Sequence, residues 1–108
     1  MNIKITYKHL ASTESLDEMT QKKSEKLKKY FHGKMNLHWN FSVEKQGHIA
    51  HCHLTGNHME FFAEASTDSL YASIDQVIQH LERQVKRVKE EVKHKPRGGR
   101  EKAALAFE

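Results

Sequence analysis

The strongest pattern of apolar and polar positions in the chain lies between residues 68 and 93. Thr67 or Ser66 can cap the start of a helix here, and Asp68 brings a negative charge to its first turn, where the helix dipole favours it. Apolar side chains recur at steps of three and four, which places them along one side of that helix. They are Leu70, Ile74, Val77, Ile78, Leu81, Val85, Val88 and Val92.

A second helix is predicted nearer the N-terminus, from Ser12 or Thr13 to about Phe31. Gly33 is a natural stop after it, because glycine readily takes the left-handed conformation that ends many helices. We expect the stem of Lys23 to pack at the helix edge while its ammonium group reaches the solvent. Lys23 interrupts an apolar stripe that consists of Leu16, Met19, Leu27, Tyr30 and Phe31.

Four segments alternate between apolar and polar residues, which is the pattern of strands with one buried face. They are residues 2–8, 37–45, 48–55 and 58–66. Turn residues separate the last three, at Gln46-Gly47 and at Gly56-Asn57. The side chains expected to face the core are Ile3, Ile5, Tyr7, Leu37, Trp39, Phe41, Val43, Ala50, Cys52, Leu54, Phe61, Ala63 and Ala65.

The order of these elements predicts an α+β fold: a two-layer β-α-β-β-β-α arrangement, with a four-stranded sheet and two parallel helices on one face. Residues 1–95 form the single domain that 108 residues can build. Pro96 and Gly98-Gly99 end regular structure, so residues 96–108 are predicted to be a short, flexible, basic tail. Because one small core uses all the apolar stripes, we expect the free protein to be a monomer.

The charge balance favours an anionic partner. Eighteen Lys and Arg residues against fourteen Asp and Glu give a net charge of +4 with the nine histidines neutral. The single Cys52 cannot form an intramolecular disulfide and fits a reducing compartment. No apolar run approaches the roughly 18 residues needed to span a bilayer, and the N-terminus lacks the apolar stretch of a secretion signal. We therefore expect a cytoplasmic protein.

The basic residues of the two helices fall on particular flanks. One flank of the first helix carries Lys22, Lys26 and Lys29, and one flank of the second carries Lys86, Lys89 and Lys93, with Arg83 next to them. On parallel neighbouring helices these flanks can face each other, and the two rows would then border one basic groove. The alternative is an ordinary solvated helix face, in which intervening glutamates dilute the positive charge.

Two further residues lie on the groove side of the second helix. We expect Tyr71 to be a packed ring with a hydrogen-bonded hydroxyl group rather than a platform for a base. Asp75 either orients a neighbouring Lys or Arg or is an ordinary surface carboxylate.

The histidines of the third strand raise the question of a metal site. His51 and His53 share one face, and His38 or His58 could approach them across the sheet, but zinc needs three or four ligands in tetrahedral reach. Solvated strand histidines are the preferred interpretation, with Cys52 on the other face as a small buried residue. No catalytic arrangement or phosphate-binding glycine loop stands out, so we expect no enzyme, no cofactor and no metal.

Several stretches resemble the ribosome hibernation-promoting factor and ribosome-associated inhibitor family. They are DSLYASID followed by HLERQVKRVK in the second helix, KKSEKLKKYF in the first, VEK at the end of the second strand and EFFAEA in the fourth. The resemblance covers roughly residues 1–95, and the predicted element order is that of the family. The chain is similar to the short members, which lack the second, dimerising domain of the long ones.

The resemblance implies a protein that binds the rRNA of the small ribosomal subunit, in the channel for messenger and transfer RNA, and so inhibits translation in stationary phase or stress. Short members either pair ribosomes with a separate partner factor or block pairing through a longer tail. His80 departs from the family, since many relatives carry Lys there. The basic positions that match the family are Lys23, Lys26, Arg83, Arg87, Lys89 and Lys93. With the two helix rows, the candidate rRNA-binding residues are Lys22, Lys23, Lys26, Lys29, Arg83, Lys86, Arg87, Lys89 and Lys93.

Two other functions fit parts of the sequence. A sheet with two helices on one face is also the shape of general double-stranded-RNA-binding modules. The apolar stripe of the second helix could instead form a coiled coil with a partner protein. The second alternative is disfavoured, because the stripe ends near Val92 and is needed to cover the sheet.

Overall fold

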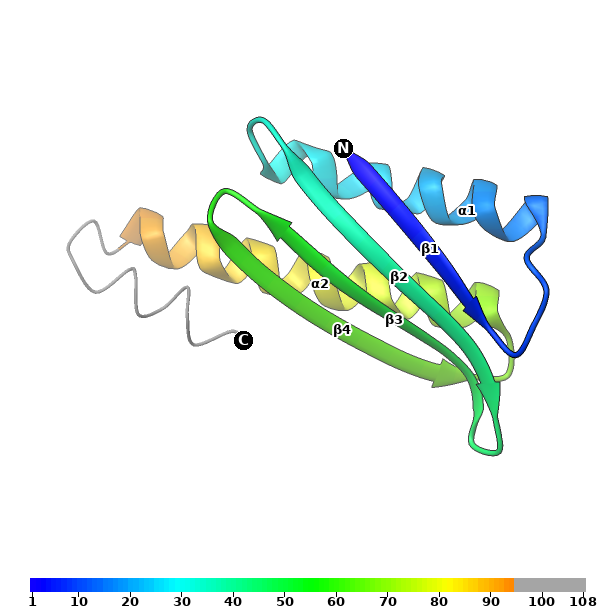
Figure 1. The fold of residues 1–108 in the computed structure, drawn as a ribbon. Coiled ribbons are helices and arrows are strands. Elements are labelled where there is room, and N and C mark those ends of the chain that lie inside the picture. The colour runs from blue at the N-terminus through cyan, green and yellow to red at the C-terminus, as the bar shows by residue number, and fades with distance from the viewer. Residues whose placement is uncertain (95–108) are drawn as a thin grey trace.

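The computed structural model describes residues 1–94 as a four-stranded sheet with helices on one face (Figure 1). In chain order the elements are β1 (Asn2–Lys8), α1 (Glu14–Ser24), the 3₁₀ helix η1 (Glu25–Tyr30), β2 (Met35–Glu44), β3 (Gly47–Gly56), β4 (Met59–Thr67) and α2 (Leu70–His94). β1 pairs in parallel with β2, and β2, β3 and β4 pair antiparallel in chain order. The predicted α+β architecture is confirmed. The tail predicted at residues 96–108 lies outside the described residues.

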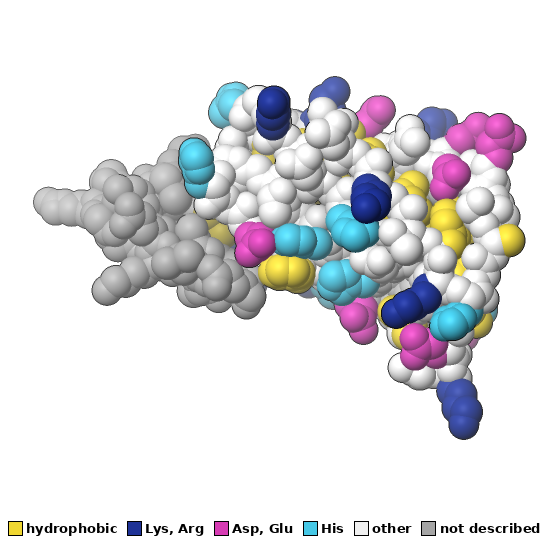
Figure 2. Space-filling view, viewed as in Figure 1, with side chains coloured by type: hydrophobic (Ala, Val, Ile, Leu, Met, Phe, Trp, Pro, Cys, Tyr) yellow, Lys and Arg dark blue, Asp and Glu magenta, His cyan; other side chains and the backbone are white. Residues whose placement is uncertain are grey.

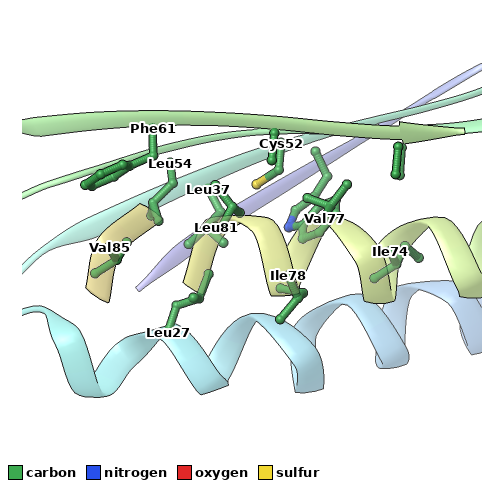
Figure 3. Close-up of a cluster of buried hydrophobic side chains, with 14 of the residues drawn as sticks. Leu27, Leu37, Cys52, Leu54, Phe61, Ile74, Val77, Ile78, Leu81 and Val85 are labelled. Atoms are coloured by element: carbon green, nitrogen blue, oxygen red, sulfur yellow. The ribbon is translucent and has the colours of Figure 1, made fainter. Parts of the chain in front are cut away.

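The core lies between the sheet and the helix layer (Figure 3). Trp39, Phe41 and Phe61 are the largest fully buried side chains of the sheet, and Leu27 of η1 belongs to the same core. Each fully buried large apolar side chain contributes roughly 1.5–3 kcal/mol, so the stripe of α2 is what holds this helix on the sheet. The buried residues of that stripe are Leu70, Ile74, Val77, Ile78, Leu81, Val85 and Val88.

The first helix differs from the prediction in its second half. The α-helix ends at Ser24, and Glu25–Tyr30 continue as a 3₁₀ helix rather than as the α-helix predicted to reach Phe31. In a 3₁₀ helix, side chains three residues apart lie on the same side. Ser24 and Leu27 are fully buried and Tyr30 is half-buried, so the tighter winding keeps all three on the inner side, where an α-helix would turn Tyr30 away.

The start of α2 also lies later than predicted. Thr67 is still paired in β4, opposite His48, so neither it nor Ser66 can cap the helix. Ser69 does so instead: its Oγ accepts a hydrogen bond from the backbone N–H of Ala72 at 3.2 Å. Asp68 therefore precedes the helix, and the first turn of α2 carries no acidic residue.

One residue predicted to face the core lies on the surface. Val43 is 40% exposed, whereas its neighbour Ser42 is buried. Val43 pairs with His48 close to the turn of the β2–β3 hairpin, which projects beyond the start of α2 (Figure 1). None of the helices that the structure describes covers the sheet there, so alternation in the sequence does not lead to burial. Within residues 1–94, none of the helices has the length and apolar character that crossing a membrane requires.

Candidate nucleic-acid interface

Local signals at both ends of α1 set the position of its lysines. Thr13 caps the helix, with its Oγ1 accepting a hydrogen bond from the backbone N–H of Leu16 at 3.1 Å. Glu14 and Asp17 lie in the first turn, and Lys22 and Lys23 in the last, which is the arrangement that the helix dipole favours. The burial of Leu16 against the core then turns the lysine-bearing flank towards α2.

Polar contacts join α1 and η1 to α2 along a line that we call the helix seam. At one end the hydroxyl groups of Ser15 and Tyr71 share a hydrogen bond of 2.8 Å. In the middle Lys23 Nζ lies 2.9 Å from Asp75 Oδ1. Because the contacts advance along both helices in the same sense, α1 and α2 run parallel, as predicted (Figure 1).

Glu82 of α2 closes the other end of the helix seam. Its Oε2 accepts a hydrogen bond from Tyr30 Oη at 2.9 Å and lies 3.7 Å from Lys29 Nζ. Burial and, second to it, this hydrogen bond to a carboxylate raise the pKa of Tyr30 to about 12. Lys29 also lies over the Tyr30 ring, 5.3 Å from its centroid. Three side chains thus fix the spacing of the helices at this point.

The four candidate lysines of α1 and η1 differ in exposure. Lys22, Lys26 and Lys29 are exposed, and of these the ammonium group of Lys29 lies 3.7 Å from Glu82 Oε2. Lys23 is half-buried, with 29% of its side chain exposed. Its predicted position at the helix edge is confirmed, but its ammonium group is paired with Asp75. Of the two alternatives for Asp75, the orienting role is therefore the one that the structure shows.

The candidates on α2 occupy two flanks rather than one. Glu82 faces α1, whereas Gln84 faces β4 and donates from Nε2 to the carbonyl oxygen of Phe62 at 2.9 Å. At about 100° per residue, Lys86 and Lys89 return to the flank of Glu82. Arg87 falls on the flank of Gln84 by the same spacing. Arg83 lies between the two flanks, on the outer side of the helix.

The candidate residues of α2 all lie at least partly in solvent where their side chains are described. Arg83, Lys86 and Arg87 are exposed, and Lys89 is half-exposed. Lys93 lies within α2, but the position of its side chain is not among those that the structure describes. Five of the candidate lysines thus form two rows beside the helix seam, which we call the lysine rows. One row consists of Lys22, Lys26 and Lys29, and the other of Lys86 and Lys89. That the rows border a groove for RNA stays a prediction.

Sequence reasoning missed part of the helix seam. The sequence predicts only that glutamates of α2 dilute positive charge, yet one of them, Glu82, binds Tyr30 and Lys29. A signal was present, because Tyr71, Asp75 and Glu82 are spaced by four and seven residues and so share one flank. The expectation for Tyr71 holds in part: its hydroxyl is hydrogen-bonded, but 45% of the residue is exposed.

His38, His51 and His53 lie on the sheet face opposite the helices, and histidine side chains gather across the middle of this face in Figure 2. His53 Nε2 lies 2.8 Å from Glu60 Oε2. Within residues 1–94 no group of three or more His, Cys, Asp or Glu side chains is arranged to hold a metal ion. Cys52 is fully buried on the other face, and burial raises the pKa of its thiol.

Comparisons with known proteins point to one family. A family model described as sigma 54 modulation protein / S30EA ribosomal protein matches residues 3–93. The ribosome hibernation promoting factor of Salmonella typhimurium is 36% identical over 93 residues, which cover 86% of this chain and 98% of that protein. The protein of the same name from Escherichia coli K12 is 33% identical over 93 residues, with the same coverage.

Two solved structures have the same fold as this chain. The crystal structure of the Thermus thermophilus protein Y N-terminal domain has a TM-score of 0.76 and 28% sequence identity, and the match covers 81% of this chain and 98% of that one. A ribosomal subunit interface protein from Coxiella burnetii has a TM-score of 0.73 over 83% of this chain and 99% of that one. At 23% identity, the second likeness shows the fold alone.

Proposed function

Because this chain belongs to the sigma 54 modulation protein / S30EA ribosomal protein family, we propose that it is a ribosome hibernation factor. It binds the small ribosomal subunit in the channel for messenger and transfer RNA and thereby inhibits translation in stationary phase or stress. Relatives that bear the name ribosome hibernation promoting factor support this function, since the chain covers nearly their whole length. A protein of this kind works in the cytoplasm and has no catalytic step.

The observation that supports an rRNA contact is the pair of lysine rows. Lys22 and Lys26 are exposed on α1, and Lys86 is exposed on α2 across the helix seam. Lys and Arg contacts to phosphates position a protein on a nucleic acid without reading its bases. Folded RNA is recognised largely through shape and backbone, so two rigid cationic rows suit it better than a flexible basic segment would.

The helix seam supplies that rigidity. Lys23–Asp75 and Tyr30–Glu82 join the two helices at separate points, and the core beneath them is fully packed. The spacing of the rows is therefore set before RNA arrives. Little backbone order then remains to be gained on binding, which favours affinity.

A direct test compares two sets of charge removals. A variant with Lys22, Lys26, Lys86 and Lys89 replaced by Ala should sediment poorly with small subunits, while Lys4→Ala with Lys8→Ala, on β1, should sediment like the parent chain. Each lost phosphate contact should make the log-log salt dependence shallower by about 0.7–0.9. Equal losses per removed charge in the two sets would contradict the proposed interface and indicate unspecific attraction to RNA.

A competition experiment separates this function from general binding of double-stranded RNA. Purified small subunits and a random RNA duplex, at equal nucleotide concentration, would compete for the labelled protein. Preference for the subunit by tenfold or more is the expected result. Comparable competition by the duplex would favour the general RNA-binding module instead.

A further inference from the structure

The sheet face opposite the helices carries an exposed aromatic residue between two acidic ones. Phe62 of β4 is 41% exposed. Glu60 and Glu64 are two residues away on either side, so their side chains stand on the same face of the strand. Figure 2 shows this face, which neither helix covers. We call Phe62, Glu60, Glu64 and His53 the β4 patch.

The Phe62 ring is held in one orientation. Phe62 pairs with His53 across β3 and β4, and the two rings stack with centroids 4.3 Å apart and planes 6° apart. His53 is itself fixed by its 2.8 Å contact with Glu60. β4 is the edge strand of the sheet. One side of the Phe62 ring therefore meets His53, and among residues 1–94 no strand lies beyond the other side.

Charge on this face is separated between its two edges. β4 carries Glu60 and Glu64 and no Lys or Arg, whereas the strand cations, Lys4 and Lys8, belong to β1. Three strand spacings of about 4.8 Å put β1 roughly 14 Å from β4, which is beyond the Debye length of about 8 Å at physiological salt. Among the charged Lys, Arg, Asp and Glu side chains of the strands, a phosphate at Phe62 would therefore meet mainly the two glutamates, whereas a cation would be attracted.

A guanidinium group can interact with both the aromatic ring and the carboxylate of the β4 patch. It is planar and can stack on the open side of Phe62, an arrangement favourable by cation–π attraction. From there it can donate a two-pronged hydrogen bond to the Glu64 carboxylate. A hollow of about 290 Å³ shares Glu64 with the β4 patch, and its lining also includes Asn40, Glu44, His51 and, on the β1 side, Lys8. It can accept a polar next side chain of an extended chain.

We propose that the β4 patch docks an arginine-containing, basic segment of another protein, with an arginine stacked on Phe62 and paired with Glu64. The patch lies on the opposite layer from the lysine rows, so this contact goes beyond the proposed function and does not depend on it. The protein would then hold an RNA partner on its helix layer and a protein partner on its sheet.

The test uses the full chain and a defined probe. A capped peptide, Gly-Ser-Arg-Gly-Ser-Arg-Gly-Ser, is titrated into isotope-labelled protein while backbone amide signals are followed by NMR. Shifts should centre on Phe62, His53 and Glu64. A peptide with citrulline in place of arginine has the same shape without the charge and should bind at least fivefold more weakly. Phe62→Ala should weaken binding about two- to fivefold, and Glu64→Gln should weaken it as well.

Matched controls keep the result interpretable. Lys4→Gln, on the far edge of the same face, should bind the arginine peptide as well as the parent chain does. Phe62 is exposed, so its replacement should leave the rest of the amide spectrum in place. The proposal is overturned if Phe62→Ala or citrulline changes nothing, or if a short single-stranded RNA shifts the same amides at lower concentration. Shifts at these amides that grow with protein concentration alone would point to a second copy and overturn it too.

Discussion

Tyr30 and Glu82 are 52 residues apart in the chain, yet the Tyr30 hydroxyl donates a 2.9 Å hydrogen bond to the Glu82 carboxylate. With Lys23 and Asp75, they show how acidic residues of α2 are used within a cationic surface. Both carboxylates lie between the lysine rows. They join the helices, and they also place negative charge where an RNA phosphate would approach.

Removing one of these acidic charges should strengthen RNA binding. Asp75→Asn keeps the shape of the side chain but releases the ammonium group of Lys23, so the affinity for small subunits should rise by up to about fivefold. That limit follows from an interaction of about 1 kcal/mol between unit charges 4 Å apart in water. Because the pair is partly exposed, the unfolding free energy should fall by less than about 1 kcal/mol.

The control for this prediction is Glu44→Gln, which removes an exposed carboxylate at the end of β2. Binding isotherms at two salt concentrations would compare the two variants. A rise in affinity of the same size for Glu44→Gln would mean that net charge, and not the position of Asp75, governs binding.

The two flanks of α2 should contribute unequally. Replacing Lys86 and Lys89 by Ala removes cations beside the helix seam, whereas replacing Arg83 and Arg87 removes them from the outer side and the β4 side. If RNA lies along the lysine rows, the lysine pair should cost more affinity and flatten the salt dependence more. Filter binding to small subunits would measure both. A larger loss from the arginine pair would place the contact on the other flank of α2.

Periodicity was sufficient to predict the architecture, because burial in this fold follows the two basic repeats. The step of two predicted β1 with its observed bounds, residues 2–8. The steps of three and four predicted that α2 packs on the sheet through Leu70, Ile74 and Leu81, all of which are buried. Both patterns reflect which side chains the core buries, and this does not depend on which residue caps a helix or ends a strand.

Features decided by competition between local and tertiary contacts were not predictable from the sequence. Ser66, Thr67 and Ser69 are all residue types that can cap the start of α2. Because Thr67 pairs with β3, the cap is Ser69. The 3₁₀ turn of η1 depends on burial of Ser24 and Leu27 against the sheet. The candidate residues could be named from spacing and family resemblance, but the pairing of Lys23 and the separate flank of Arg87 required knowing what each side of α2 contacts.

A buried hydrogen bond between α1 and β2 should matter for stability. Trp39 Nε1 donates to Ser24 Oγ at 3.1 Å, and both residues are fully buried. Ser24→Ala leaves the indole N–H without a partner and should lower the unfolding free energy by about 1–3 kcal/mol. Urea denaturation would measure it. Ser15→Ala removes an exposed hydrogen bond to Tyr71 and should cost much less. Equal effects would mean that Trp39 finds another acceptor.

Stability should also fall at alkaline pH because of Tyr30. Burial and the hydrogen bond to Glu82 raise its pKa from 10.0 to about 12, so the folded state holds the phenol proton more tightly than the unfolded chain does. This contribution is fully present below pH 10 and is lost as the pH rises from there to about 12. Burial raises the pKa of Tyr7 as well, assisted by a 2.7 Å hydrogen bond to Asp17, and acts in the same direction.

Two measurements check the predicted loss of stability at alkaline pH. Phenolate absorbance should show Tyr30 and Tyr7 ionising above the ordinary pKa of a tyrosine hydroxyl group, 10.0. Tyr30→Phe keeps the ring but has no proton to lose, so its melting temperature should decline less steeply than that of the parent chain across this pH range. Because burial is the larger cause, Glu82→Gln should only partly lower the pKa of Tyr30. A Tyr30→Phe variant with an unchanged alkaline decline would show that Tyr30 is not the group that titrates.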